Sequence, residues 1–259
     1  MTGSLAELLG LAEHQIAVAF WVFIRIGAAM ALLPVLGESS VPVRVKLALT
    51  LALTVVVAPA VEGRFSLPDV QTSSRIVLFA SEVGIGLVVG LYLRLFVIAL
   101  QVAGAIAAQS TSLSQAFAGA SVEPQPAFGN LLVVAGLALM VTMKIHVVFV
   151  EYLVFSYQVF DLGSLGNAGM LAQWGAEEIQ KSFRLAFSLA APFAIASLIY
   201  NIALGAINRA MPQLMVSFVG APAVTAGGLA LLFLASPVML AAWSAALTAA
   251  LAAGLGSGP

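Results

Sequence analysis

The sequence predicts an all-α, polytopic membrane protein built from long, broken helical hairpins. Hydrophobic residues make up 62% of the 259 residues and charged residues 8%, whereas a soluble domain carries about 25% charged residues. The mean hydropathy is +1.10, and several apolar stretches reach the length of about 20 residues that crosses a bilayer. These observations exclude a soluble domain with a large core.

Charge and cysteine content exclude further classes. The formal net charge is −1 and no basic run occurs, so we expect no nucleic-acid binding. The absence of cysteine excludes disulfides, thiol catalysis and cysteine-ligated metals. Glu7 and Glu13 stand where a secretory signal carries basic residues, so we expect no cleavable signal peptide.

The first apolar segment, Gln15–Leu36, is long enough to cross a membrane. Arg25 lies in its middle, where a charge is costly in lipid, so its side chain should face protein or water. Gly27 and Ala31 stand four residues apart and predict the close approach of another helix.

A compact break, PVLGESSVPVR, follows this segment. We expect Gly37 to end the first helix. Ser39 or Ser40 should then cap the next helix, with Pro42 in its first turn. The second span is predicted at Val43–Val61.

The third segment, Ile76–Ala108, contains no proline and is much longer than one crossing needs. Gly86 and Gly90 form a GxxxG pair, which predicts close helix packing. Glu82 and Arg94 are separated by about 18 Å along the helix axis, so they cannot pair with each other. We expect their partners elsewhere, on other helices or other chains.

The stretch between the two apolar halves, GAIAAQSTSLSQAFAGASVEPQPAFG at residues 104–129, is polar but carries only one charge, Glu123. Small uncharged residues suit irregular backbone that is buried in protein or lines a wet cavity at membrane depth. Phe117 is the one large apolar residue between Leu113 and Phe128. We therefore interpret the stretch as a plug, with an ordinary surface loop as the alternative. The candidate gate residues are Gln109, Ser110, Ser112, Leu113, Ser114, Gln115, Phe117 and Pro124.

The second half begins with a long helical candidate, Asn130–Gln158. The Gly-rich residues 159–176 predict a true loop. Residues 177–184 are typical of an amphipathic helix start that leads into the apolar segment Phe183–Ile207. The sequence NRAMPQ predicts a sharp break. The last 40 residues are interrupted by Pro222, the pair Gly227-Gly228 and Pro237, and they predict either one broken helix or a hairpin of two.

Five charged residues fall inside or beside the apolar segments: Arg25, Glu82, Arg94, Lys144 and Glu151. Transporters use such residues as substrate or proton sites, so a small secondary transporter is the alternative function. In a structural interpretation, they form ion pairs between helices or snorkel near helix ends.

No constellation of residues indicates an enzyme. The two histidines, His14 and His146, are not in an HExxH motif, and the two aspartates, Asp69 and Asp161, lie in predicted loops. No GxSxG motif occurs. We predict no catalytic, cofactor or metal site.

Two long stretches, together with the central segment, closely resemble the FliR/SctT family of type III export-gate proteins. They are IRIGAAMALLPVLGESSVPVRVKLALTLALT (Ile24–Thr54) and NIALGAINRAMPQLMVSFVGAPAVTAGGLALL (Asn201–Leu232). The order of the motifs is more specific than any one of them, and the resemblance covers nearly the whole chain. In one departure, Leu214 and Met215 follow the Pro-Gln pair, soon after which the family often has asparagine. The motif positions are Gly37, Glu38, Pro42, Arg44, Asn208, Arg209, Pro212 and Gln213.

The resemblance implies an integral inner-membrane component of the flagellar type III protein export gate, at the basal body. With FliP-like and FliQ-like subunits, and a FlhB-like protein beneath, it would form a helical multi-subunit channel for unfolded flagellar substrates. The resemblance also implies a FliP-like N-terminal half (residues 1–108), a lumenal plug loop (109–128) and a C-terminal half (129–259) that ends FliQ-like. The five charges would be buried in this assembly, and the further partners implied are the unfolded substrates in transit and the lipid bilayer. No cofactor is implied.

Overall fold

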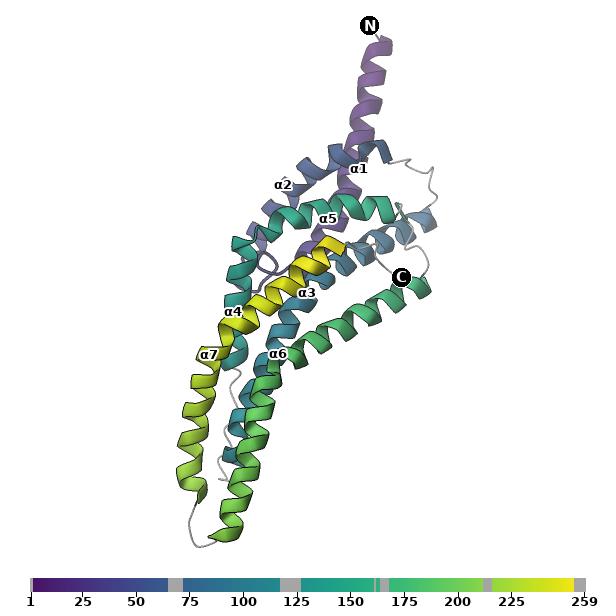
Figure 1. Cartoon of the computed structure of the whole chain (residues 1–259). Coiled ribbons are helices and arrows are strands. Elements are labelled where there is room, and N and C mark those ends of the chain that lie inside the picture. Colours follow the sequence, from purple (N-terminus) through teal and green to yellow (C-terminus); the bar gives the residue numbers. More distant parts are fainter. Residues whose placement is uncertain are drawn as a thin grey trace. The chain divides into compact units, whose positions relative to one another are not determined.

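The computed structural model describes residues 2–64, 72–116, 127–160, 162–163, 168–211 and 216–253 (Figure 1). In these ranges the chain is almost entirely helical and has no β-strand, which confirms the predicted all-α class. Within the same ranges, five helices are long and apolar enough to cross a membrane, and one bent pair can supply a sixth crossing.

Two compact units are built from separate stretches of the chain. Unit 1 contains Met1–Arg94, Met140–Glu177 and Leu251–Pro259, and unit 2 contains Leu95–Leu139 and Glu178–Ala250. Four helices therefore contribute to both units: α3 (Thr72–Ala116), α4 (Ala127–Thr142), α6 (Ala168–Ala210) and α7 (Val216–Ala253). The predicted division of the chain into residues 1–108, 109–128 and 129–259 stays a prediction.

Unit 1 is organised around α1 (Thr2–Leu32), which packs against α2 (Val43–Val61). The core stripe of α1 consists of side chains four residues apart, Val18, Val22, Ile26 and Met30, all of which are almost fully buried. After α2 the chain makes a short 3-10 helix, Glu62–Arg64. The helix α1 ends at Leu32, four residues before the predicted end, while the bounds predicted for α2 are confirmed.

Gly37 lies in the turn that follows α1 rather than at the end of the helix. A Cβ atom at this position would lie 2.5 Å from the carbonyl oxygens of Leu33 and Met30, so the turn accepts only glycine. The predicted serine cap was wrong. The N-cap of α2 is Pro42, without a side-chain hydrogen bond, which leaves both serines too far upstream to reach the first turn.

The predicted GxxxG contact is confirmed between α3 and α1. A Cβ atom on Gly86 would overlap the carbonyl oxygen of Arg25 and lie 2.8 Å from Ala28 Cβ. A Cβ atom on Gly90 would lie 2.5 Å from the carbonyl oxygen of Ala29. The two glycines therefore allow the backbones of α3 and α1 to touch.

The predicted helix Asn130–Gln158 is in fact two helices, α4 and α5 (Ile145–Val159), which meet at a 73° bend. The break falls at Lys144, whose φ of 55° places it in the left-handed region. Neither proline nor glycine marks this position, so the sequence carries no conventional signal for it.

Two other boundaries differ from the prediction. The helix α6 begins at Ala168, so the loop predicted at residues 159–176 was wrong from that point on. A glycine inside a helix costs only about 1 kcal/mol, which tertiary packing readily offsets. The helix α3 continues to Ala116, eight residues beyond Ala108. Residues 216–253 form one helix, α7, so the part of the last 40 residues that the structure describes is not a hairpin.

Unit 2 packs around an indole. Trp243 of α7 is fully buried, and its Nε1 donates a hydrogen bond to the carbonyl oxygen of Phe96, at 2.9 Å. Gly136 of α4 makes room for Leu100 of α3, whose Cδ1 a Cβ atom would overlap, and the Trp243 ring lies beside it at ordinary contact distances of 3.5 and 3.7 Å. A Cβ on Gly104 would lie 2.5 Å from the backbone nitrogen of Gly129, so α3 and α4 also touch through glycines.

Candidate functional site

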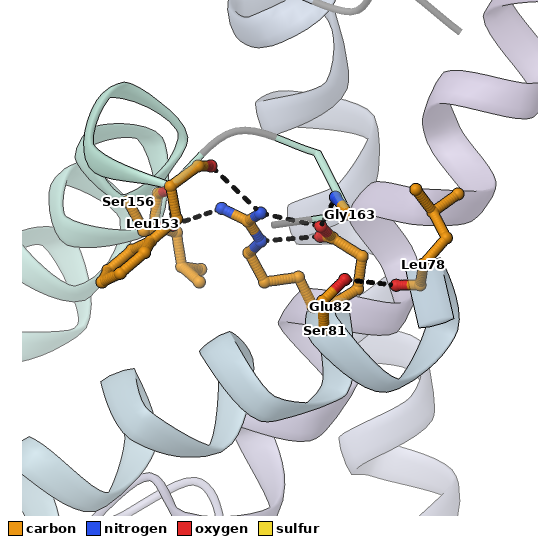
Figure 2. Close-up of polar contacts among 8 residues, drawn as sticks. Leu78, Ser81, Glu82, Leu153, Ser156 and Gly163 are labelled. Atoms are coloured by element: carbon orange, nitrogen blue, oxygen red, sulfur yellow. Dashed lines mark hydrogen bonds and ion pairs between the residues drawn. The ribbon is translucent and has the colours of Figure 1, made fainter. Parts of the chain in front are cut away.

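Arg25 of α1 and Glu82 of α3 form a buried ion pair in unit 1 (Figure 2). The guanidinium donates from Nε to Glu82 Oε2 at 2.7 Å and from Nη2 to Glu82 Oε1 at 2.9 Å. Both side chains have an exposed fraction of 0%. This two-pronged geometry is the strongest form of arginine–carboxylate contact, and it supplies the partners that the sequence left open.

The end of α5 and the turn after it complete the polar shell. Arg25 Nη1 donates to Ser156 Oγ at 3.1 Å, and Nη2 also reaches the carbonyl oxygen of Phe160 at 3.4 Å. The backbone nitrogen of Gly163 donates to Glu82 Oε1 at 3.4 Å. The guanidinium carbon lies 3.6 Å from the centroid of the Tyr157 ring, within range of a cation–π contact.

This cluster is suited to holding the fold and not to binding a ligand. Each nitrogen of the Arg25 guanidinium and both oxygens of Glu82 already have partners. Removing two charges from water costs several kcal/mol each, and such complete pairing is what offsets that cost. The ion pair therefore links α1, α3 and the α5 terminus and leaves no charge to attract a substrate.

A second ion pair, between Arg94 of α3 and Glu38, attaches the α1–α2 turn to α3. Its side chains are partly accessible, at 26% and 22%. In the same turn, Lys46 Nζ donates to the carbonyl oxygen of Gly37 at 2.8 Å. Three of the predicted residues, Gly37, Glu38 and Arg94, thus act together in fixing this turn.

The remaining predicted residues are not brought together. Those with exposed side chains are Arg44, Gln109, Lys144, Glu151, Asn208 and Arg209. Ser110 is half-buried and donates to the carbonyl oxygen of Ile106 within α3. Outside the described side chains or residues lie Ser112, Leu113, Ser114, Gln115, Phe117, Pro124, Pro212 and Gln213.

The sequence analysis did not predict the contacts that α5 and the turn after it make with Arg25 and Glu82. These contacts come from Ser156, Tyr157, Phe160 and Gly163. A signal was present, because Ser156 and Tyr157 follow the stripe of buried apolar residues in α5. Polar side chains on a buried face require hydrogen-bond partners. Gly163, with a φ of 79°, allows the sharp turn that brings its nitrogen to Glu82. Among the described residues, no three His, Asp or Glu side chains are placed to hold a metal ion.

Unlike the buried Arg25–Glu82 pair, the apolar surface of α6 is largely exposed. Only 11% of the most apolar stretch of α6 is buried, against 50% for α3. Helically spaced side chains with exposed fractions near 60% form a continuous face on α6: Phe187, Ile195, Leu198, Ile199 and Ile202. We call these five residues the α6 face. A surface of this kind requires lipid or another protein against it.

The sequence matches the family described as "Bacterial export proteins, family 1" over residues 16–250. It is 32% identical over 232 residues to the flagellar biosynthetic protein FliR of Caulobacter vibrioides, covering 89% of this chain and 92% of that protein. The FliR protein of Escherichia coli is 29% identical over 229 residues, covering 85% and 84%. The FliR protein of Bacillus subtilis is 26% identical over 211 residues, covering 78% and 79%.

Proposed function

Because this chain belongs to the bacterial export proteins of family 1, we propose that it forms, with FliP-like and FliQ-like subunits, the flagellar channel for unfolded proteins. Family membership makes it a component of the flagellar export apparatus. Its apolar helices agree with a place in the inner membrane at the basal body. A FlhB-like protein is the further partner that we propose.

One observation favours the channel subunit over the secondary transporter. A transporter needs membrane-embedded charges that can reach a substrate or a proton. Arg25 and Glu82, the two deepest charges in the described residues, are instead locked to each other with no exposed surface. The other candidates for such a site, Lys144 and Glu151, lie on the outside of the chain.

The exposed apolar helices support a subunit that is completed by partners. Like α6, the helix α7 exposes most of its apolar surface, since only 17% of its most apolar stretch is buried. The large exposed side chains of α7 are Leu229, Phe233, Leu234 and Val238. We propose that FliP-like and FliQ-like helices cover part of these surfaces and that lipid covers the rest.

Co-expression tests the assembly. With FliP-like and FliQ-like partners, the chain should purify as a large complex whose mass is measured by native mass spectrometry. Without them, the uncovered apolar faces should cause loss or aggregation in mild detergent. Recovery of a stable, monodisperse monomer would favour the transporter instead.

We further propose that the polar stretch of residues 109–126, which begins in the last turns of α3, closes the idle channel, with Phe117 as its main apolar obstacle. A conduit for unfolded chains must bind no side chain strongly, and small uncharged residues meet that demand. A hydrophobic constriction excludes water and ions. This part of the proposal rests on the sequence and the family resemblance.

Ion leakage tests the closure. Deleting residues 112–120 in the complete, substrate-free gate should dissipate the membrane potential, measured with a potential-sensitive dye. Phe117→Ala should leak partially, and Phe117→Asp should leak more because a charge invites water. If the deletion variant assembles and holds its potential like the parent, the stretch is an ordinary surface loop.

A further inference from the structure

An apolar groove of about 950 Å³ lies within unit 1, between the α1–α2 turn, α2, the end of α4 and α5. Its wall is formed by residues 34–36 of the turn, Leu49 and Leu53 of α2, Met140 of α4 and Phe149 of α5. Figure 1 shows α5 lying beside α2. The volume falls at the upper end of the roughly 300–1,000 Å³ range of small-molecule pockets.

The groove is open to its surroundings. Two of its lining side chains on α5, Val147 and Phe155, have exposed fractions of 48% and 37%. Both α2 and the α4–α5 pair are candidate membrane spans. In a bilayer, lipid therefore has access to this apolar wall.

Basic groups gather where the groove meets the helix starts. His146 lines the groove, and the exposed Lys144 stands two residues before it. On α2, Lys46 stands on the same face as the lining Leu49 and Leu53, and its Nζ donates to the carbonyl oxygen of Gly37, which follows the lining turn. The one carboxylate in the wall is Glu151, further along α5, while Glu38 is neutralised by Arg94.

We propose that this groove binds a phospholipid with an anionic headgroup. Its acyl chains lie along Leu53 and Phe149, and its phosphate lies at the end that carries Lys144 and Lys46. Basic pockets between membrane helices have this chemistry, and each Lys or Arg near an anionic lipid surface contributes about 1 kcal/mol. The inference concerns a lipid and does not depend on the proposed export function.

Lipid binding to the full-length protein, purified with the subunits that accompany it, tests the site. Native mass spectrometry with added phosphatidylglycerol or phosphatidylcholine should show retained phosphatidylglycerol in preference. Lys144→Gln should weaken phosphatidylglycerol binding about fivefold, which corresponds to about 1 kcal/mol. Arg184→Gln, which removes an exposed cation of α6 outside the groove wall, is the matched control and should change nothing.

Photo-crosslinking in intact membranes tests the acyl-chain position without purification. A photoactivatable fatty acid, incorporated by the expressing cells, should label the groove wall more strongly than the α6 face. Leu53→Trp fills the groove and should remove the labelling, whereas Val55→Trp, on the same helix but outside the wall, should keep it.

Three results would overturn the proposal. Equal retention of the two lipids would show that the groove has no preference for an anionic headgroup. Labelling spread evenly over every exposed apolar helix would leave only annular lipid. Crosslinks from the groove wall to another protein, made with a photoreactive residue at Leu53, would make the groove a protein interface.

Discussion

The helices α3 and α6 are similar in length and each contains a long apolar stretch, yet they differ widely in how much of that stretch is buried. They contain 45 and 43 residues, and their apolar stretches have hydropathies of 2.4 and 1.8. Nonetheless 50% of one stretch is buried and only 11% of the other. The difference lies in what each helix offers at a few positions.

Small residues and a paired charge determine the burial of α3. Gly86 and Gly90 touch the backbone of α1. One turn before Gly86, Glu82 forms its ion pair with Arg25. In α6, Gly205 has no neighbouring heavy atom within 4 Å of where a Cβ would be. Hydropathy therefore predicts a membrane helix but not the side from which other helices approach it.

Breaking the buried ion pair that holds α3 against α1 should have the largest effect on stability. Arg25→Leu or Glu82→Leu leaves an uncompensated buried charge, which costs about 3–5 kcal/mol. We expect the chain to lose its folded state, measured by the thermal transition of the purified complex and by its level in membranes.

The double variant Arg25→Leu/Glu82→Leu is the control, since it removes both charges. Replacing a whole buried pair by apolar residues is often nearly neutral. The double variant should therefore be more stable than either single one. A double variant as unstable as the single ones would show that the pair is not the cause of the loss.

Gly86→Leu should have the next largest effect, because its side chain meets the backbone of α1 and not a movable side chain. Overpacking of this kind costs about 1–3 kcal/mol. Gly205→Leu is the matched control on α6 and should leave the thermal transition of the chain unchanged. If both glycines tolerate leucine equally, the contact between α3 and α1 does not explain the burial of α3.

Arg94→Gln probes a pair of intermediate exposure. With side chains 26% and 22% accessible, the pair with Glu38 should contribute about 0.2–1 kcal/mol. We expect a small shift of the thermal transition that shrinks further at high salt. A shift as large as that of Arg25→Leu would contradict the ranking by exposure.

Lys181→Gln should have the smallest effect. Lys181 pairs with Glu178 within α6, and the lysine side chain is 63% exposed. Such surface pairs on a helix contribute at most about 0.5 kcal/mol. A thermal transition indistinguishable from that of the parent is the expected result, and clear destabilisation would mean that this part of α6 is covered in the assembly.

Much of the first half could be predicted from the sequence. The bounds of α2, the glycine contact of α3 and the need for a partner at Arg25 all follow from rules that act within a few residues. The identity of that partner does not follow, because Glu82 is 57 residues away and pairing at that distance depends on tertiary packing.

The second half was less predictable, for a related reason. The bend at Lys144 uses a lysine in the left-handed region, a conformation that residue type alone does not indicate. In the opposite direction, the glycines near the start of α6 and the prolines inside α7 suggested breaks that do not occur. Long-range packing overrode local propensity at each of these positions.

The separation of Arg25 and Glu82 along the chain also bears on how the protein is made. When a ribosome has added Arg25, the carboxylate that neutralises it is still 57 residues from synthesis. At about 5–20 residues per second, this interval lasts about 3–11 seconds. An unpaired arginine in mid-membrane costs about 3 kcal/mol during that time. The first three helices are therefore expected to leave the insertion machinery together, with α1 held back until α3 arrives.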